Sequence, residues 1–257
     1  MAKAKYRLGM LTPSSNTVLE PVVQAMLIGL PDVSAHFSRF RVTEIALSDR
    51  ALGQFAEKPM LEAAELLAEA KVDVICWNGT SSGWLGLDQD RRLCERITQA
   101  TGIPAATSVL SLVELLRRTA VESFALVSPY TEDIQQRIIE TFRAEGFACV
   151  AERHSSLSDN FSFAQVGEAE LDAMVRSAAV SKAQALTTFC TNLWSAPLVE
   201  GWERGLGVPV YDTIATAVFG SLESAGIDPS RVEGWGRLFA VPARMAATID
   251  ARWKNAR

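Results

Sequence analysis

The sequence predicts an α/β protein of two pseudo-symmetric halves, each a four-stranded, mainly parallel sheet flanked by helices, with the functional site between the halves. Two observations support this prediction. Short apolar runs rich in β-formers alternate with stretches of helical period along the whole chain, which is typical of βαβ units. A faint internal repeat also pairs VDVICWNGTSS, a helix and GIPAATS with AQALTTFCTNL, a helix and GVPVYDT.

The first half begins with a predicted strand, Tyr6–Leu11, which ends in the turn-forming sequence TPSSN. Asn16 then lies where it can cap a helix whose apolar residues recur at helical spacing. The same periodicities predict the later elements: a helix over Pro59–Ala70, a strand over Val72–Trp77, a loop over Asn78–Gly83, and helices over Asp88–Thr101 and Ser111–Arg118. We expect this half to comprise roughly residues 1–118 together with 215–257.

The second half, roughly residues 119–214, repeats the alternation of strands and helices. Its predicted elements are a strand over Ser123–Val127, a helix over Glu132–Glu145, a strand near Phe147–Glu152, a helix over Glu168–Ala179, a strand over Ala185–Phe189 and a helix over Pro197–Leu206. The polar loop His154–Phe163 is the longest candidate for a mobile lid.

Composition excludes several classes of function. Net charge is −5 and the 25 Lys and Arg residues are scattered, so there is no electrostatic footprint for nucleic acid. No run approaches the roughly 18 apolar residues of a membrane span, and the N-terminal stretch lacks a signal-peptide core, which predicts a cytoplasmic protein. Four cysteines without CxxC spacing and only two histidines, His36 and His154, predict free thiols and no metal site.

Polar loops follow several predicted strands. In open parallel sheets, ligands bind beyond the carboxyl ends of strands, where hydroxyls, amides and helix N-termini favour anions. The loops of this kind are Ser14-Ser15-Asn16, Gly79-Thr80-Ser81-Ser82, Ser128-Pro129-Tyr130-Thr131 and Cys190-Thr191-Asn192. Any one of them could be an ordinary helix cap, but their recurrence at strand ends predicts an anionic ligand.

Cys190 is the candidate reactive group. It directly follows a predicted strand and precedes a predicted helix, whose dipole would stabilise a thiolate and lower the pKa of the thiol. The pattern therefore favours a nucleophile or an acid–base group at this position. Cys76 in an apolar strand, Cys94 inside a helix and Cys149 in or beside a strand are predicted to be structural.

Three segments resemble the aspartate/glutamate racemase superfamily, in the branch that contains maleate cis–trans isomerases and arylmalonate decarboxylases. They are GMLTPSSNTVLEP at Gly9–Pro21, VSPYTEDIQQR at Val127–Arg137 and GWGRLF at Gly234–Phe239, and the resemblance runs over nearly the whole chain. In racemases and isomerases of this superfamily, two cysteines face each other across the substrate. The second maps onto Cys190, whereas the first maps onto Gly79, as it does in the decarboxylases.

The resemblance implies an enzyme without a cofactor that acts on a small mono- or dicarboxylate. Loss of the first cysteine favours decarboxylation of a substituted malonate, because this reaction needs one proton donor where racemisation needs two. Cys190 would protonate an enediolate that an oxyanion hole stabilises. The implied substrate-binding residues are Ser14, Asn16, Thr80, Ser81, Tyr130, Thr191 and Asn192.

Other functions stay open at this point. Asn16, Thr191 and Asn192 are similar to the isomerases and racemases, in which case Cys190 would add to the double bond of maleate as a nucleophile. A racemase acting on Asp-like or Glu-like substrates comes third, and a non-catalytic carboxylate-binding protein is the alternative from another class. The sequence leaves the number of subunits open, a homo-oligomer included.

Overall fold

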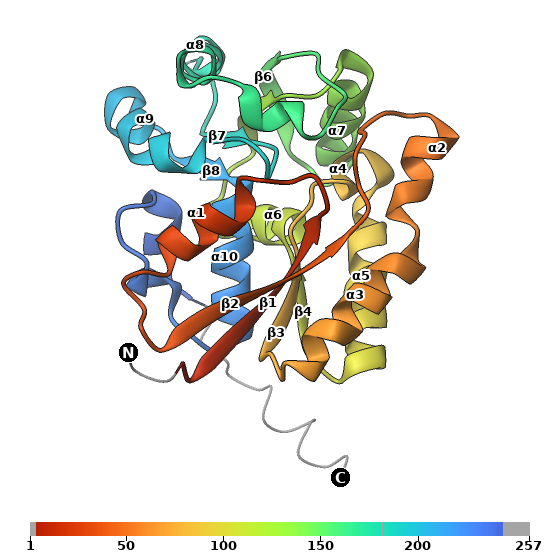
Figure 1. Ribbon diagram of the computed structural model, residues 1–257. Helices are drawn as coiled ribbons and strands as arrows, with labels where there is room; N and C mark the ends of the chain where they lie inside the picture. Colours follow the sequence, from red (N-terminus) through yellow and green to blue (C-terminus); the bar gives the residue numbers. More distant parts are fainter. Residues whose placement is uncertain (1–3, 181, 244–257) are drawn as a thin grey trace.

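The computed structural model describes residues 4–180 and 182–243, which form two four-stranded parallel sheets (Figure 1). The first sheet has the order β2-β1-β3-β4 and the second the order β6-β5-β7-β8, so both halves repeat one topology. The strands are β1 Tyr6–Pro13, β2 Val33–Phe40, β3 Val74–Trp77, β4 Ala105–Thr107, β5 Ser123–Ser128, β6 Ala148–His154, β7 Ala185–Thr188 and β8 Val210–Asp212. The predicted fold class of two similar α/β halves is confirmed.

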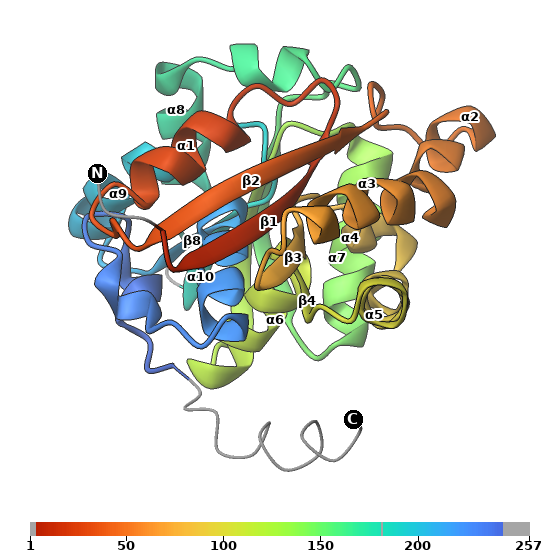
Figure 2. The same cartoon turned by 60° about the horizontal axis from the view of Figure 1, so that its bottom comes forward.

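Helices cover both faces of each sheet. In the first half, α3 and α5 lie on one side of the sheet, and α1 and α10 lie on the other (Figure 2). The helices are α1 Leu19–Met26, α2 Asp49–Leu52, α3 Glu57–Glu69, α4 Ser82–Leu85, α5 Leu87–Thr101, α6 Ser108–Arg118, α7 Glu132–Ala144, α8 Glu168–Ala178, α9 Val199–Leu206 and α10 Thr213–Ser224. None of those in the described ranges combines the length and apolar character needed to cross a membrane.

Most predicted elements form within a few residues of their expected bounds, but several expectations were incomplete or wrong, and the short strands β4 and β8 and the helices α2 and α10 were not predicted. Strand β2 was not predicted, because its sequence VSAHFSRF mixes polar and apolar residues, as suits an edge strand with an incompletely buried surface. The expected loop Asn78–Gly83 already contains the start of the short helix α4. The helix expected from Pro197 begins at Val199, after a single 3₁₀ turn.

Helices α6 and α10 connect the two halves. Helix α6 leads from β4 to β5, and α10 follows β8 but packs on β3 and β4 of the first sheet as well as on α6. Their contact is close at Gly220, where an added Cβ would lie 2.0 Å from the Ser111 hydroxyl oxygen. A side chain at position 220 would therefore displace the Ser111 hydroxyl or push the two helices apart.

This contact predicts opposite effects for two glycine-to-alanine changes within helices. Gly220→Ala should lower the free energy of unfolding by about 1–3 kcal/mol, since overpacking outweighs the gain in helix propensity. Gly201→Ala in α9 should raise it by about 0.5–1 kcal/mol, because nothing lies within 4 Å of the added Cβ. Urea unfolding of both variants checks this, and a Gly220→Ala protein at least as stable as wild type would contradict the packing.

Candidate functional site

A small cavity lies at the carboxyl ends of strands from both halves. Its volume of about 20 Å³ has room for roughly one water molecule. It is lined by Pro13, Val42, Ile45, Phe55, Trp77, Gly79, Thr80, Ser81, Trp84, Tyr130, Asn160, Cys190 and Thr191. The structure thus brings Cys190, Gly79 and four of the predicted substrate-binding residues to one place, at the position expected for a ligand in this type of sheet.

Cys190 lies two residues beyond the end of β7 and is almost fully buried. Its sulfur accepts a hydrogen bond from the Asn192 N–H at 3.3 Å. Burial raises the pKa of the Cys190 thiol to about 12, and hydrogen bonding from Tyr130 and Asn192 lowers it less. The expectation of a lowered pKa was wrong, because the chain forms turns after Cys190 and α9 begins only at Val199. A neutral thiol in this place is able to give a proton.

Hydroxyl groups form the polar wall beside the thiol. Thr80 and Tyr130 are hydrogen-bonded to each other at 2.6 Å between their hydroxyl oxygens. The Tyr130 ring is held edge-on between Trp84 and Phe163, each with ring centroids 5.3 Å away. Burial raises the pKa of Tyr130 well above its ordinary value, so this phenol also stays protonated. Together with Ser81, these groups are able to donate hydrogen bonds to an anionic oxygen.

The side-chain position of Gly79 is occupied by a neighbouring ring. An ideal Cβ on Gly79 would lie 2.0 Å from a carbon of the Trp77 indole, far inside contact distance. The indole is itself packed on Phe40, with ring centroids 5.1 Å apart. A larger residue at position 79 would therefore have to displace Trp77.

Asp212 anchors the turn that carries Cys190, a role the sequence reasoning missed. Its carboxylate accepts hydrogen bonds from the hydroxyls of Thr188 at 2.8 Å and Ser195 at 2.5 Å, one on each side of Cys190. The same carboxylate caps α10 through the Ile214 N–H at 2.8 Å. An Asp directly before a helix is an ordinary cap in sequence, so only the folded chain shows that it also holds the turn.

Asn16 joins the first half to the Cys190 loop. Its Oδ1 accepts from the Val18 and Leu19 N–H groups at 3.0 and 2.9 Å, which caps the segment leading into α1. Its Nδ2 donates to the Thr191 carbonyl at 2.9 Å. Asn16 does not line the cavity, and its amide is already used by the protein. Asn16 therefore binds the N–H groups at the start of α1, as expected, although Val18 occupies the N-cap position itself, and its substrate-binding role stays a prediction.

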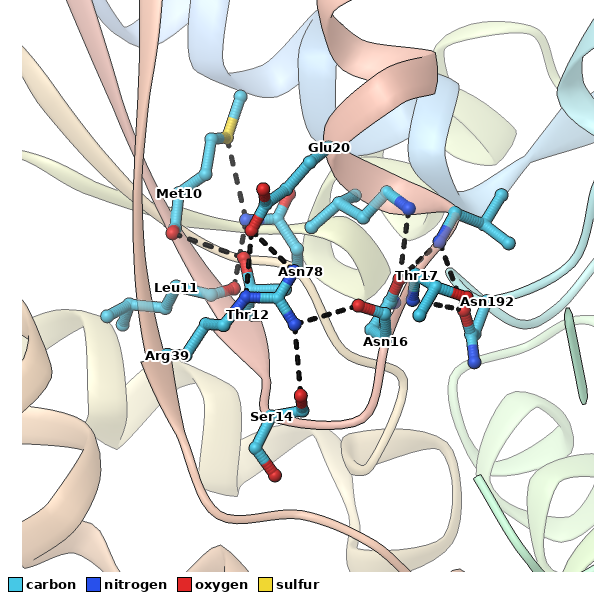
Figure 3. Close-up of polar contacts among 12 residues, drawn as sticks. Met10, Leu11, Thr12, Ser14, Asn16, Thr17, Glu20, Arg39, Asn78 and Asn192 are labelled. Carbon is cyan, nitrogen blue, oxygen red and sulfur yellow. Dashed lines mark hydrogen bonds and ion pairs between the residues drawn. The ribbon is translucent and has the colours of Figure 1, made fainter. Parts of the chain in front are cut away.

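Asn192 and Ser14 are likewise hydrogen-bonded within the protein, close to Asn16 (Figure 3). The Asn192 Oδ1 accepts from the Thr17 N–H at 3.0 Å, and its Nδ2 donates to the Asn160 carbonyl at 2.6 Å. The Ser14 hydroxyl accepts from the Val42 N–H at 3.2 Å. Neither side chain lines the cavity, so their part in substrate binding also stays a prediction.

Two loops from opposite halves close over the cavity. The Ile45 N–H donates to the Ser158 carbonyl at 2.8 Å, and the Asn160 N–H donates to the Thr43 carbonyl at 2.9 Å. Val42, Ile45 and Phe55 supply an apolar wall from a segment that contains no motif, so nothing in the sequence identified them. The loop expected as a lid does cover the cavity through Asn160, and its mobility stays a prediction.

Two similar α/β halves with a buried cysteine at the strand ends between them define a class of cysteine-bearing, two-sheet α/β proteins. The sequence model of the arylmalonate decarboxylase family matches residues 31–239, and the chain belongs to this family. This confirms the resemblance drawn from the sequence.

The sequence is similar to enzymes of two kinds. Maleate isomerases from Nocardia farcinica and Pseudomonas putida are 29% and 28% identical over 251 and 249 residues, covering 94% and 91% of this chain and 98% and 97% of theirs. The arylmalonate decarboxylase of Bordetella bronchiseptica is 26% identical over 183 residues, which cover 70% of this chain and 76% of the decarboxylase.

A solved structure shows the same fold together with covalent chemistry on cysteine. A cysteine-to-serine mutant of the Nocardia farcinica maleate cis-trans isomerase, with a covalently bound succinylcysteine intermediate, superposes with a TM-score of 0.84. It is 26% identical and covers 91% of this chain and 98% of that protein.

The contacts of Asn16 predict that it supports the fold. Asn16→Ala should lower the free energy of unfolding by about 1–3 kcal/mol, because buried N–H groups and the Thr191 carbonyl lose their partners. Thr17→Ala, a change to the exposed neighbouring side chain, should alter it by less than about 0.5 kcal/mol. Urea unfolding measures both changes. An Asn16→Ala protein as stable as wild type would show that these contacts of Asn16 do not stabilise the fold.

The raised pKa of Cys190 predicts a loss of stability at alkaline pH. The ordinary thiol pKa is 9.0 and the folded value is about 12, so the folded state favours the thiol and its contribution is complete below pH 9. It falls as pH rises from about 9 towards 12, by up to about 1.4 kcal/mol per pH unit. The stability of Cys190→Ala should therefore fall less steeply than that of wild type between pH 8 and pH 10.5 in urea unfolding, and parallel profiles would contradict the shift.

Proposed function

We propose that the protein decarboxylates a substituted malonate, with Cys190 as the proton donor. The observation that supports this proposal is the environment of the thiol: Cys190 shares its cavity with Gly79 and the Trp77 ring, where the two-cysteine relatives described above would have a second thiol. Among the described residues, Cys190 is the one cysteine that lines the cavity. Decarboxylation needs a single proton delivered to one face of the product carbon.

The arrangement suits that reaction. The retained carboxylate would accept hydrogen bonds from Thr80, Ser81 and Tyr130, and the departing carboxylate would lie against the apolar wall. The carbon–carbon bond breaks, carbon dioxide leaves, and the bonding electron pair forms an enediolate. Cys190 donates its proton to the carbon, and the resulting thiolate then recovers a proton from water. Because burial raises the pKa of the thiol to about 12, the proton is in place before the reaction begins.

Entry of such a substrate requires the cavity to widen. Its volume of about 20 Å³ is far below the roughly 300 Å³ typical of small-molecule sites. The two loops that meet over it are joined by only a few backbone hydrogen bonds, such as that from Ile45 to Ser158. Their separation would open the cavity without disturbing either sheet.

Maleate isomerisation is the second candidate, and the comparisons favour it over decarboxylation. The relatives that match over nearly the whole chain are maleate isomerases. In that reaction the Cys190 thiolate would add to the double bond, the central bond would rotate, and elimination would give fumarate. The pKa of about 12 works against it, because the thiol would first have to lose its proton.

The two candidates are separated by incubation with phenylmalonate, maleate and aspartate in deuterated water, followed by NMR. We expect carbon dioxide release and phenylacetate with one deuteron incorporated. Fumarate formation from maleate would instead establish the isomerase, and α-proton exchange of aspartate without net reaction would indicate a racemase. Ligand binding with no turnover of any of the three compounds would leave a carboxylate-binding protein.

A matched pair of cysteine variants tests the role of the thiol. Cys190→Ala should lose at least about 10³-fold in turnover while it still binds substrate, since the proton donor is removed. Cys149→Ala, on the edge strand β6, should keep wild-type turnover. Wild-type turnover by Cys190→Ala would refute any mechanism that depends on this thiol.

A further inference from the structure

Two buried tryptophans in the cavity wall have indole N–H groups without an acceptor. Trp77 is 1% exposed and Trp84 is 6% exposed, and both line the cavity that contains Cys190. Neither N–H has a hydrogen-bond partner among the residues that the structure describes. Buried donors are nearly always paired, and an unpaired one destabilises a fold unless a ligand or water supplies the acceptor.

Both rings are fixed where they lie. Trp77 packs on Phe40 and occupies the space beside Gly79. Trp84 lies edge-on to Tyr130 and Phe55, with ring centroids 5.3 and 5.9 Å away. Rigid donors that need no reorganisation are well suited to binding an anion, because the entropy of ordering them has already been lost on folding.

We propose that the indole N–H groups of Trp77 and Trp84 donate hydrogen bonds to a carboxylate oxygen of the substrate. Trp77 also determines the reaction specificity of the site, because its ring keeps position 79 free of a side chain. This inference rests on the proposed function. It enlarges the anion site beyond Thr80, Ser81 and Tyr130, and it specifies a carboxylate whose oxygens face aromatic N–H donors and hydroxyls together. Hydrogen bonds from such donors become stronger as negative charge develops in the enediolate.

Phenylalanine substitutions remove the N–H and keep an aromatic ring. In the Cys190→Ala background, which stops turnover, Trp77→Phe and Trp84→Phe should each raise the Kd of phenylmalonate about tenfold in calorimetric titration, as expected for a hydrogen bond to a charged group. The control is Trp202→Phe, because the Trp202 N–H is already paired with Asp172 at 3.0 Å, and its Kd should not change. A Kd within twofold of the parent for both cavity variants would overturn the inference.

Thermal unfolding distinguishes binding from packing. Each substitution empties the space of the five-membered ring of a buried indole, so Trp77→Phe and Trp202→Phe should each melt a few degrees below the parent. A much larger drop for Trp77→Phe than for Trp202→Phe, together with weaker binding, would mean that the variant disturbs the cavity, and this would overturn the assignment. Binding of phenylmalonate that depends on both indoles, without any turnover by wild type, would refute the proposed function and support this inference.

Substitutions at positions 79 and 77 test whether the Trp77 ring excludes a side chain beside it. Gly79→Cys alone should lower the melting temperature by several degrees, because its Cβ would lie 2.0 Å from the Trp77 ring. The double variant Trp77→Leu, Gly79→Cys should melt higher than Gly79→Cys, since the smaller side chain makes room. A Gly79→Cys protein that melts like wild type would show that Trp77 does not exclude a side chain there.

Discussion

The amide bridge between the two halves is the constraint on which the site depends. Asn16 caps the segment leading into α1 and also donates to the Thr191 carbonyl, directly after Cys190. Asn192, on the other side of the same contact, accepts a hydrogen bond from the Thr17 N–H. These bonds are buried, so removal of either side chain would leave its partners unsatisfied inside the protein. The loop that carries the thiol is therefore held against the other half by polar groups as well as by apolar packing.

Close apposition of the halves determines the chemistry of the cavity. It buries both side chains, and burial keeps the Cys190 thiol and the Tyr130 phenol protonated. The indole N–H groups of Trp77 and Trp84 are buried in the same place and have no acceptor among the described residues. A buried cavity with proton donors and hydrogen-bond donors, and with no cationic side chain among the described residues that line it, suits a reaction in which negative charge develops on oxygen and is neutralised by a proton.

Much of the fold could be predicted because local patterns and tertiary structure agree. Helix α5, expected from Asp88, begins at Leu87, and β5 begins at Ser123 as expected. Strand β2 escaped prediction because pairing with β1 stabilises it more than its own mixed sequence indicates. The apolar cavity wall of Val42, Ile45 and Phe55 escaped for a similar reason, since residues brought together by loop contacts share no spacing in sequence.

The sequence by itself determined the fold class and the family and identified Cys190 as the candidate reactive group, because strand and helix periods and strand-end motifs are properties of neighbouring residues. Only the tertiary structure decided the direction of the thiol pKa, since burial depends on both halves, and the helix expected to lower it begins too late to do so. It also showed that Asn16 and Asn192 bridge the halves, and that Trp77 occupies the space beside Gly79. The first contacts join residues that are distant in sequence, and the second depends on how a ring is packed. Neither can be predicted from a local sequence pattern.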